Sequence, residues 1–291
     1  MTIEHYSVPG SIAEAAQLLR QGEVTIVAGG TDLTPQTDSG AREFAATLVN
    51  IQRIEEMRGI SLSGALSSGN YRIGGLTTVT EILESELLAA DAPVLIEAAD
   101  HFASPQIRNA ATLAGNLCNA SPAGDMIIPL LLLDATVELA RWAGAAVSYR
   151  KVDLADFFTG PGKTVMKTDE LLTAVEFAQP LDGFKATFLK TGPRPALEVA
   201  TVSMGVAGVF KDGALHGARV AIGSVAPTPL RAIDTEAVLE GRLLDEEVIE
   251  QAVETVSQEV SPIDDVRASA WYRKHLTGVY IRRALSHVAG N

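Results

Sequence analysis

The sequence predicts an α+β protein with a larger N-terminal domain, residues 1–177, and a smaller C-terminal domain, residues 178–291. Three observations support this class. Helix signals and short apolar strands alternate through the first part of the chain. Three β-rich segments then follow in succession, and amphipathic helices end the chain. The boundary is placed within the turn-rich sequence EFAQPLDGF.

The first helix is expected at residues 11–22. Ser11 precedes the periodic segment and Glu14 follows three residues later, which is the spacing of a capping box. Gly22 supplies the signal for the end of the helix. The next segment, EVTIVAGG, predicts a short buried strand that runs into a glycine turn. Another strand is expected within residues 45–54.

Further elements are predicted before the boundary. Residues 71–83 predict a strand, a Gly-Gly pair and a helix capped by Thr78 with Glu81. Apolar residues at helical spacing predict a helix at 91–103. The apolar run MIIPLLLL, residues 126–133, is too short to span a bilayer and predicts a buried helix. Hairpin-like β structure is expected to follow it.

The C-terminal domain is expected to contain a three-stranded antiparallel sheet with helices. The strands are FKATFLKT, VATVSMGVAGVF and ALHGARVAIGSV, and Asp212-Gly213 is a hairpin turn signal. Acidic amphipathic helices are expected near 234–241 and 245–258, and a final helix is expected to start near Asp264. The following residues of this helix are expected to share one face: Ala268, Trp271, Tyr272, Leu276, Val279 and Tyr280.

Charge and cysteine content exclude several classes of function. The formal net charge is −13, which argues against nucleic acid or an anionic membrane as the main partner. It does not argue against one phosphate-bearing ligand, because backbone N–H groups can bind that. The single cysteine, Cys118, excludes a disulfide framework, a cysteine zinc site and a thiolate iron–sulfur cluster within this chain. With no secretory signal at the N-terminus, the chain is expected in the cytoplasm.

Common catalytic patterns are absent from the sequence. GxGxxG, the Walker pattern and Gly-x-Ser-x-Gly do not occur. The histidines are scattered without metal-ligand spacing, so no metal site is predicted: His5, His101, His216, His275 and His287. No catalytic side chain is predicted either. If the chain performs chemistry, a cofactor is expected to supply it.

Two glycine-containing segments are the candidates for a cofactor site. In VAGGTDL, Gly29 and Gly30 follow a strand, and this pattern suits either a plain turn or a nest of N–H groups that binds an anion. The second segment, TLAGNLCNASPAGD, again offers small residues. Its last residue, Asp125, is either a solvent-facing turn residue or a carboxylate that accepts hydrogen bonds from a ribose. Together, the two segments suggest a diphosphate bound by backbone N–H groups from two sides.

Five segments in this order carry a resemblance to a known family: VAGGTDL, QIRNAATLAGNLCNASPAGD, FFTGPGKT, GSVAPTPLRA and DVRASAWYRKHL. The chain closely resembles the FAD-binding medium subunit of the molybdenum hydroxylases, which include xanthine dehydrogenases and aerobic carbon monoxide dehydrogenases. The resemblance covers nearly the whole chain. It implies an FAD-binding domain of the vanillyl-alcohol-oxidase (PCMH) type with two α/β subdomains, about 1–55 and 56–177, followed by a C-terminal domain of the carbon monoxide dehydrogenase flavoprotein type.

The resemblance also implies which residues bind FAD. The first segment would wrap the diphosphate, the second would contact the same cofactor, and Asp125 matches a ribose-binding aspartate. Phe102 and Lys190 match residues near the flavin ring, and Leu172 matches an apolar contact near the adenine or flavin. The remaining implied contacts are Ala28, Gly29, Gly30, Thr31, Asp32, Leu33, Thr112, Ala114, Gly115 and Asn116.

One residue departs from the family pattern. The second segment usually contains Thr-x-Gly-Gly-Asn, whereas this chain has Ala114 at the first of the two glycine positions. If this position needs a positive φ, alanine costs roughly 1 kcal/mol. We expect FAD still to bind, with lower affinity. An FAD-free scaffold or binding module is an alternative that only Ala114 favours.

The implied function is electron transfer within a larger enzyme. A large subunit with a molybdenum pterin cofactor would hydroxylate the substrate, and a small subunit with 2Fe-2S clusters would deliver electrons to the FAD of this chain. NAD, oxygen or a quinone would be the acceptor, and the assembly is expected to be a dimer of heterotrimers. The motifs look most like those of xanthine or purine dehydrogenases. The alternatives are carbon monoxide dehydrogenase, other N-heterocycle or aldehyde hydroxylases, and a free-standing flavoprotein reductase or oxidase.

Overall fold

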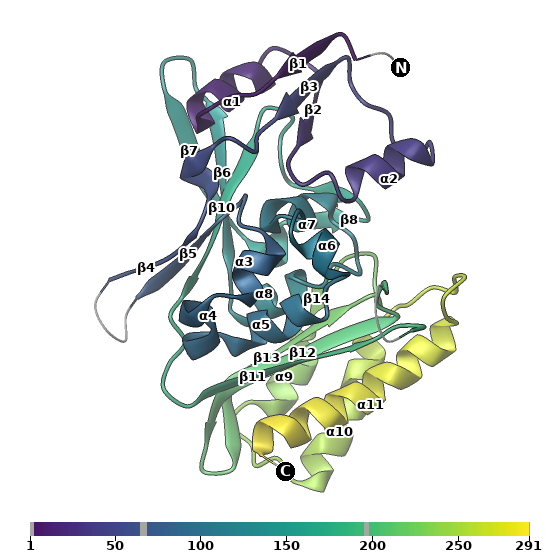
Figure 1. The fold of residues 1–291 in the computed structure, drawn as a ribbon. Coiled ribbons are helices and arrows are strands. Elements are labelled where there is room, and N and C mark those ends of the chain that lie inside the picture. Colours follow the sequence, from purple (N-terminus) through teal and green to yellow (C-terminus); the bar gives the residue numbers. More distant parts are fainter. Residues whose placement is uncertain (1–2, 65–68, 195–197, 291) are drawn as a thin grey trace.

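The computed structural model describes residues 3–64, 69–194 and 198–290 (Figure 1). Its N-terminal part is a small parallel sheet with the strand order β1-β3-β2. The strands are β1 (His5–Ser7), β2 (Val24–Val27) and β3 (Thr47–Asn50), with the helices α1 (Ile12–Leu19) and α2 (Leu33–Asp38) between them. β2 therefore runs directly into the first glycine segment, as the sequence predicts.

The predicted capping box of α1 is only half formed. The Ser11 hydroxyl accepts a hydrogen bond from the Glu14 N–H at 3.2 Å, as expected. The Glu14 carboxylate, however, accepts from the Gly10 N–H at 2.7 Å and not from that of Ser11. The helix also ends at Leu19, before Gly22. The N–H group one residue before the cap satisfies the carboxylate equally well, which the spacing alone does not distinguish.

A five-stranded antiparallel sheet forms the centre of the N-terminal region, in the order β4-β5-β10-β6-β7. Its strands are β4 (Ile60–Ser63), β5 (Asn70–Gly74), β6 (Thr136–Trp142), β7 (Val147–Asp153) and β10 (Leu171–Ala178). The helices beside it are α3 (Val79–Leu83), α4 (Glu86–Asp91), α5 (Pro93–Asp100), α6 (Pro105–Arg108), α7 (Leu113–Asn119) and α8 (Ile127–Leu132). Short elements complete it: η1 (Glu55–Met57), η2 (Leu154–Asp156), β8 (Phe158–Gly160) and β9 (Lys163–Thr164).

The predicted capping box of α3 is complete, because Thr78 and Glu81 each accept from the other's backbone N–H. The predicted apolar helix is α8, and every one of its residues is buried. Figure 1 shows the reason: α8 lies with α5 between the five-stranded sheet and the sheet of the C-terminal half. A helix covered on both sides needs apolar residues all around, so its sequence lacks an amphipathic pattern.

The C-terminal half is an antiparallel sheet, β11 (Phe184–Thr191), β12 (Val202–Lys211) and β13 (Ala214–Gly223), covered on one face by helices. The three predicted strands are present, and a fourth short strand, β14 (Leu230–Arg231), pairs with β13. Asp212 and Gly213 both have positive φ, as a two-residue hairpin turn of the I′ type requires. The helices are α9 (Ile233–Leu239), α10 (Glu246–Glu259) and α11 (Ala270–Ala289).

The predicted buried face of the last helix is wrong in part. Leu276 and Tyr280 are buried, but Trp271 is 73% exposed and Tyr272 is 40% exposed. Ala268 lies before the helix, which starts at Ala270. The face that is buried consists of Arg273, Leu276, Thr277, Tyr280, Ile281, Ala284, Leu285 and Val288.

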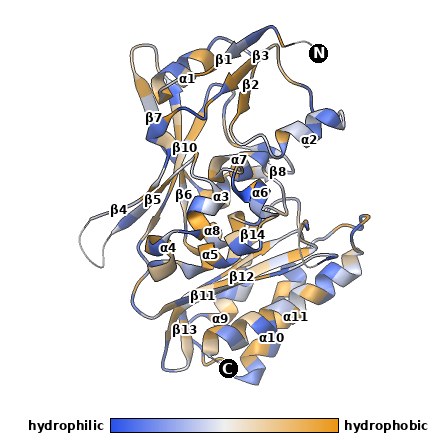
Figure 2. Cartoon of the chain, in the orientation of Figure 1, coloured by the Kyte–Doolittle hydropathy of each residue, from blue (hydrophilic) through white to orange (hydrophobic). Residues whose placement is uncertain are grey.

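Arg273 explains why the buried face of this helix differs from the predicted one. Its guanidinium donates to the carbonyl oxygens of Thr201 and Ser224 and to the Asp265 carboxylate at 2.7–3.0 Å. A buried arginine with such partners is tolerated in a core, and an apolar periodicity does not count it. Figure 2 shows the resulting alternation of hydrophilic and hydrophobic bands along α10 and α11. Within the described residues, no helix combines the length and hydropathy that a membrane span requires.

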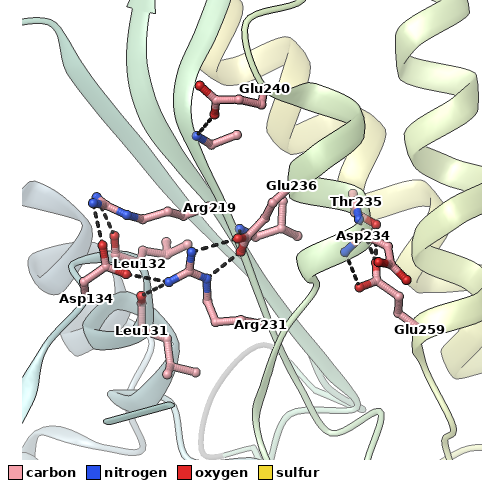
Figure 3. A network of polar contacts seen from close by, with 12 residues as sticks. Leu131, Leu132, Asp134, Arg219, Arg231, Asp234, Thr235, Glu236, Glu240 and Glu259 are labelled. Atoms are coloured by element: carbon pink, nitrogen blue, oxygen red, sulfur yellow. Dashed lines mark hydrogen bonds and ion pairs between the residues drawn. The ribbon is translucent and has the colours of Figure 1, made fainter. Parts of the chain in front are cut away.

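Two arginines of the C-terminal sheet hold the end of α8 (Figure 3). Arg231 on β14 donates to the Leu131 carbonyl at 3.1 Å and to Asp134 at 2.6 Å. Arg219 on β13 donates to the Leu132 carbonyl at 3.2 Å and pairs with Asp134 at 2.5 Å. The last turn of a helix leaves carbonyl groups without intrahelical partners, and cations are favourable there. This network therefore ties α8 to the four-stranded sheet.

Arg231→Met is expected to lower the free energy of unfolding by about 2 kcal/mol. The substitution removes the bonds to α8 and also leaves Glu236, whose carboxylate binds Arg231 at 2.5 and 2.9 Å, with a weaker set of partners. Urea denaturation followed by circular dichroism measures the effect. Arg141→Met is the matched control, because Arg141 is exposed on β6. Equal stability of the two variants would contradict the prediction.

Candidate functional site

A cavity of about 230 Å³ lies between the first glycine segment, the start of α7 and β10. It is lined by all the predicted site residues except Asp125 and Lys190. The predicted residues on its wall are Ala28, Gly29, Gly30, Thr31, Asp32, Leu33, Phe102, Thr112, Ala114, Gly115, Asn116 and Leu172. The structure therefore brings together segments that are far apart in the sequence, and we take this cavity as the candidate site.

The two glycines of the first segment are required for different reasons. A Cβ atom on Gly29 would lie 1.9 Å from the carbonyl oxygen of Ala110, so only glycine permits this close approach of two backbone segments. Gly30 has a φ of +73°, in the left-handed region that favours glycine. The first glycine joins this segment to the chain that enters α7, and the second turns the chain toward α2.

The backbone N–H groups of this segment are free. In the part of the chain that the structure describes, the N–H groups of residues 29–32 donate to no protein acceptor. The carbonyl groups, in contrast, have partners: the carbonyl of Ala28 accepts from the Gln52 side chain at 2.8 Å, and that of Gly30 accepts from the Thr34 N–H at 3.0 Å. Successive free N–H groups beside a cavity form a site that suits an anion.

The second segment is the start of a helix, which differs from the expected glycine loop. The Thr112 hydroxyl caps α7 by accepting from the Gly115 N–H at 3.1 Å, and the Asn116 N–H donates to the Thr112 carbonyl at 3.0 Å. The Ala114 N–H donates to the Gly75 carbonyl at 2.9 Å. These N–H groups are used within the protein. The second segment consequently offers side chains and a small-residue surface, and the free N–H groups come from the first segment.

The expected strain at Ala114 is absent. Ala114 does not belong to the described residues with positive φ, because it lies in the first turn of α7. It is 6% exposed and packs beside Gly75, where an added Cβ would lie 3.1 Å from the Ala114 methyl. In a helix, alanine is favoured over glycine by about 1 kcal/mol. The sequence feature that favoured an FAD-free scaffold therefore gives that alternative no support.

Polar groups on the cavity wall add to the fit for a large polar cofactor. The Asn116 side-chain oxygen is buried and has no hydrogen-bond partner among the described residues. Such an atom is costly to bury unless a ligand or water donates to it. Burial raises the pKa of the Asp32 carboxyl. The free N–H groups, the unpaired acceptor and the glycine segment together suit FAD, which carries a diphosphate and several hydroxyl donors.

Asp125 and Lys190 lie outside the cavity wall and pair with each other. The Lys190 Nζ lies 2.7 Å from the Asp125 Oδ2 and donates to the His101 carbonyl at 3.0 Å. The Asp125 side chain is 9% exposed and the Lys190 side chain is 1% exposed. Burial raises the pKa of Asp125 to about 6, although Lys190 opposes this shift. Lys190 thus binds the carbonyl of the residue that precedes Phe102, one of the residues that line the cavity.

Several cavity residues were not predicted from the sequence. Val24 and Ile26 share a face of β2 with Ala28, so the two-residue period of the strand could have identified them. Leu171 is the neighbour of a predicted residue on β10. The others have no sequence signal: Gln36, Arg42, Ile51, Ala111, Cys118, Asn119 and Met166.

Comparison with known proteins agrees with this geometry. Residues 1–180 match the family described as the FAD binding domain in molybdopterin dehydrogenase, and residues 187–288 match the CO dehydrogenase flavoprotein C-terminal domain. The xanthine dehydrogenase FAD-binding subunit of Escherichia coli O157:H7 is 32% identical over 283 residues, which cover 97% of this chain and 94% of that protein. The carbon monoxide dehydrogenase medium chain of Afipia carboxidovorans is 33% identical over 284 residues, which cover 96% and 94%.

A solved structure shows the same fold. The structure is carbon monoxide dehydrogenase from Hydrogenophaga pseudoflava, described as lacking the Mo-pyranopterin moiety of the molybdenum cofactor. It aligns with a TM-score of 0.91 at 29% identity, over 97% of this chain and 96% of that chain. The α+β class and the combination of an FAD-binding domain with a C-terminal domain are thereby confirmed. The chain belongs to the FAD-binding subunits of the molybdenum hydroxylases, the family of oxidoreductases that includes the xanthine and carbon monoxide dehydrogenases.

Proposed function

We propose that this chain is the electron-transfer subunit of a molybdenum hydroxylase that resembles xanthine dehydrogenase most closely. One observation carries the proposal: within an FAD-binding domain, a run of free N–H groups at residues 29–32 lines a cavity bounded by small residues. The similarity to the Escherichia coli xanthine dehydrogenase subunit supports the substrate class. The flavin subunit of a carbon monoxide dehydrogenase, or of another N-heterocycle or aldehyde hydroxylase, is the alternative, supported by the Afipia relative.

Each part of the site has a proposed role. The N–H groups of residues 29–32 bind the diphosphate of FAD, and Asn116 accepts a hydrogen bond from a cofactor hydroxyl or N–H. Phe102 and Leu172 supply apolar contacts that exclude water. FAD, when bound, supplies the two-electron chemistry that these side chains lack. The contacts of Asp125 with a ribose and of Lys190 with the flavin ring stay predictions, as do the other cofactor contacts.

The proposal includes partner subunits. The chain would receive electrons from the 2Fe-2S clusters of a small subunit and deliver them to NAD or another acceptor, while a large molybdenum pterin subunit hydroxylates the substrate. A dimer of heterotrimers in the cytoplasm is the proposed form. The division into residues 1–177, with subdomains of about 1–55 and 56–177, and residues 178–291 is part of the same proposal. Medium chains of multi-subunit enzymes among the relatives support it.

The visible spectrum of the purified full chain tests the proposal, with the released cofactor identified by mass. We expect about one FAD per chain, as in cofactor-carrying subunits of such enzymes. Co-expression with the partner subunits and gel filtration then test assembly. A chain that binds no flavin, alone and in the assembled complex, would contradict the proposed function.

Gly30→Val is expected to remove most of the bound FAD. A β-branched side chain is strongly disfavoured at a φ of +73°, so the backbone of the N–H segment has to change. Absorbance of the purified variant near 450 nm, roughly the flavin band, measures the retained cofactor. Gly144→Val is the control, since Gly144 has a φ of +101° in the turn after β6, and a Cβ there has open space. A Gly30→Val variant with full FAD content would contradict the role of this segment.

A further inference from the structure

Arg42 is the cation on the cavity wall, and no sequence pattern singles it out. It lies between α2 and β3, and its backbone N–H donates to the Gln36 carbonyl at 3.1 Å. Gln36 itself lines the cavity. This bond therefore fixes the backbone of Arg42 beside a helix that forms part of the site.

The guanidinium of Arg42 has no protein partner. Over residues 3–64, 69–194 and 198–290, this exposed guanidinium forms no ion pair or hydrogen bond. A guanidinium offers five N–H donors in a planar arrangement that matches phosphate oxygens. An unpaired arginine on the wall of an anion-binding cavity is consequently available for a ligand.

The charges on the cavity wall indicate that Arg42 favours the binding of a diphosphate. Asp32 and Arg42 are the charged residues that line the cavity, so their formal charges cancel. Without Arg42, the wall would carry only the Asp32 carboxylate, within a chain whose net charge is −13. Backbone N–H groups contribute partial charges alone. A diphosphate would then enter a site with an unfavourable overall field.

We propose that the Arg42 guanidinium binds the diphosphate of FAD from the exposed rim of the cavity and completes the site formed by the N–H groups of residues 29–32. This inference rests on the proposed function, because it requires FAD in this cavity. It assigns a charged residue to a site that otherwise consists of backbone groups and neutral side chains. It also makes the affinity for FAD dependent on ionic strength, since an exposed charge is screened by salt.

Titration of FAD into the flavin-stripped full chain tests this inference, with quenching of flavin fluorescence as the readout. Arg42→Gln is expected to weaken FAD binding about tenfold, the effect of losing one charge-assisted contact that is partly screened. Arg42→Lys should lose less, because it keeps the charge but not the planar donor group. Arg20→Gln, at the exposed end of α1, is the matched control for the same change in net charge and is expected to bind as the wild type does.

Salt dependence separates a diphosphate contact from an effect on the fold. Raising the ionic strength from about 0.1 M to 1 M shortens the Debye length from about 10 Å to 3 Å, which should weaken the wild type several-fold and Arg42→Gln much less. A wild-type chain that binds no FAD would contradict the proposed function and this inference together. If the wild type binds FAD while Arg42→Gln keeps both its affinity and its salt dependence, the inference alone is wrong. An unchanged salt dependence with weaker binding also contradicts it, because that result indicates a structural role for Arg42.

Discussion

Gly29→Ala is expected to lower the affinity for FAD at least about 100-fold, because an approximately 1 Å displacement of a site can cost that much. The added Cβ would lie 1.9 Å from the carbonyl oxygen of Ala110 and 2.7 Å from its carbonyl carbon. Contacts this short do not occur, so one of the two backbone segments has to move. The partner segment is fixed, since the next carbonyl, that of Ala111, accepts from the Val79 N–H at 3.0 Å. The glycine segment and its N–H groups would therefore move.

This prediction differs from the one for Gly30 in its physical cause. Gly29 does not have a positive φ, so alanine brings no backbone strain of its own there. The whole effect comes from the close approach to Ala110. Equilibrium titration with FAD measures it, and circular dichroism shows whether the chain still folds. Gly10→Ala is the control for the same substitution, because the nearest atom to a Cβ at Gly10 is 3.8 Å away. Wild-type affinity in Gly29→Ala would show that the packing of these two segments does not shape the site.

Local signals predicted the elements whose determinants lie close together in the sequence. The capping box of Thr78 and Glu81 joins residues three positions apart within one helical turn, and it formed as predicted. The strand before Gly29 and the I′ turn at Asp212 depend on adjacent residues and also formed. The last helix was predicted less well. Its buried face depends on Arg273, whose partners Thr201 and Ser224 are far away in the sequence, so periodicity of apolar residues misplaced Trp271.

The same distinction applies to the candidate site. The first glycine segment is visible in the sequence because glycines and a hydroxyl follow a strand directly. Thr112 could have been identified as a helix cap from its own type and the following residues, which would have removed the expected strain at Ala114. The position of Arg42 depends on the path of a loop, and the pairing of Asp125 with Lys190 joins residues 65 positions apart. No local pattern specifies such contacts.

Asp125→Asn is expected to lower the free energy of unfolding of the flavin-free chain at neutral pH by at most about 3 kcal/mol, because Lys190 loses its ion-pair partner while the Asp125 charge, which burial disfavours, is removed as well. The Lys190 ammonium is almost completely buried, and Asp125 is its ion-pair partner. Lys190→Met should cost less, about 2 kcal/mol, because the remaining carboxyl can take up a proton. The double variant should be more stable than the sum of the single effects implies, since it leaves no unpaired charge. Urea denaturation of all four chains measures this coupling.

The pH dependence of the same comparison follows from the pKa of Asp125. Burial raises this pKa to about 6, above the value near 4 of the unfolded chain. Between these two values the folded chain binds the proton more tightly, so the contribution of Asp125 to stability is present at low pH and is lost as the pH rises through about 6. The wild type should accordingly gain stability relative to Asp125→Asn when the pH is lowered from 7 to 5. A constant difference across this range would contradict the raised pKa.

The double variant also separates two roles of this ion pair. The pair joins the segment before α8 to β11, and Lys190 also binds the carbonyl of His101, next to the cavity-lining Phe102, so its position suits either a structural or a cofactor-binding role. Asp125→Asn combined with Lys190→Met removes the charges while restoring most of the stability, which leaves FAD affinity as an independent measurement. If both residues contact FAD, the refolded double variant should bind it at least about tenfold more weakly, as expected for the loss of charge-assisted hydrogen bonds. If its affinity equals that of the wild type, the pair serves to hold the two halves of the chain together, and the cofactor depends on the glycine segment and α7.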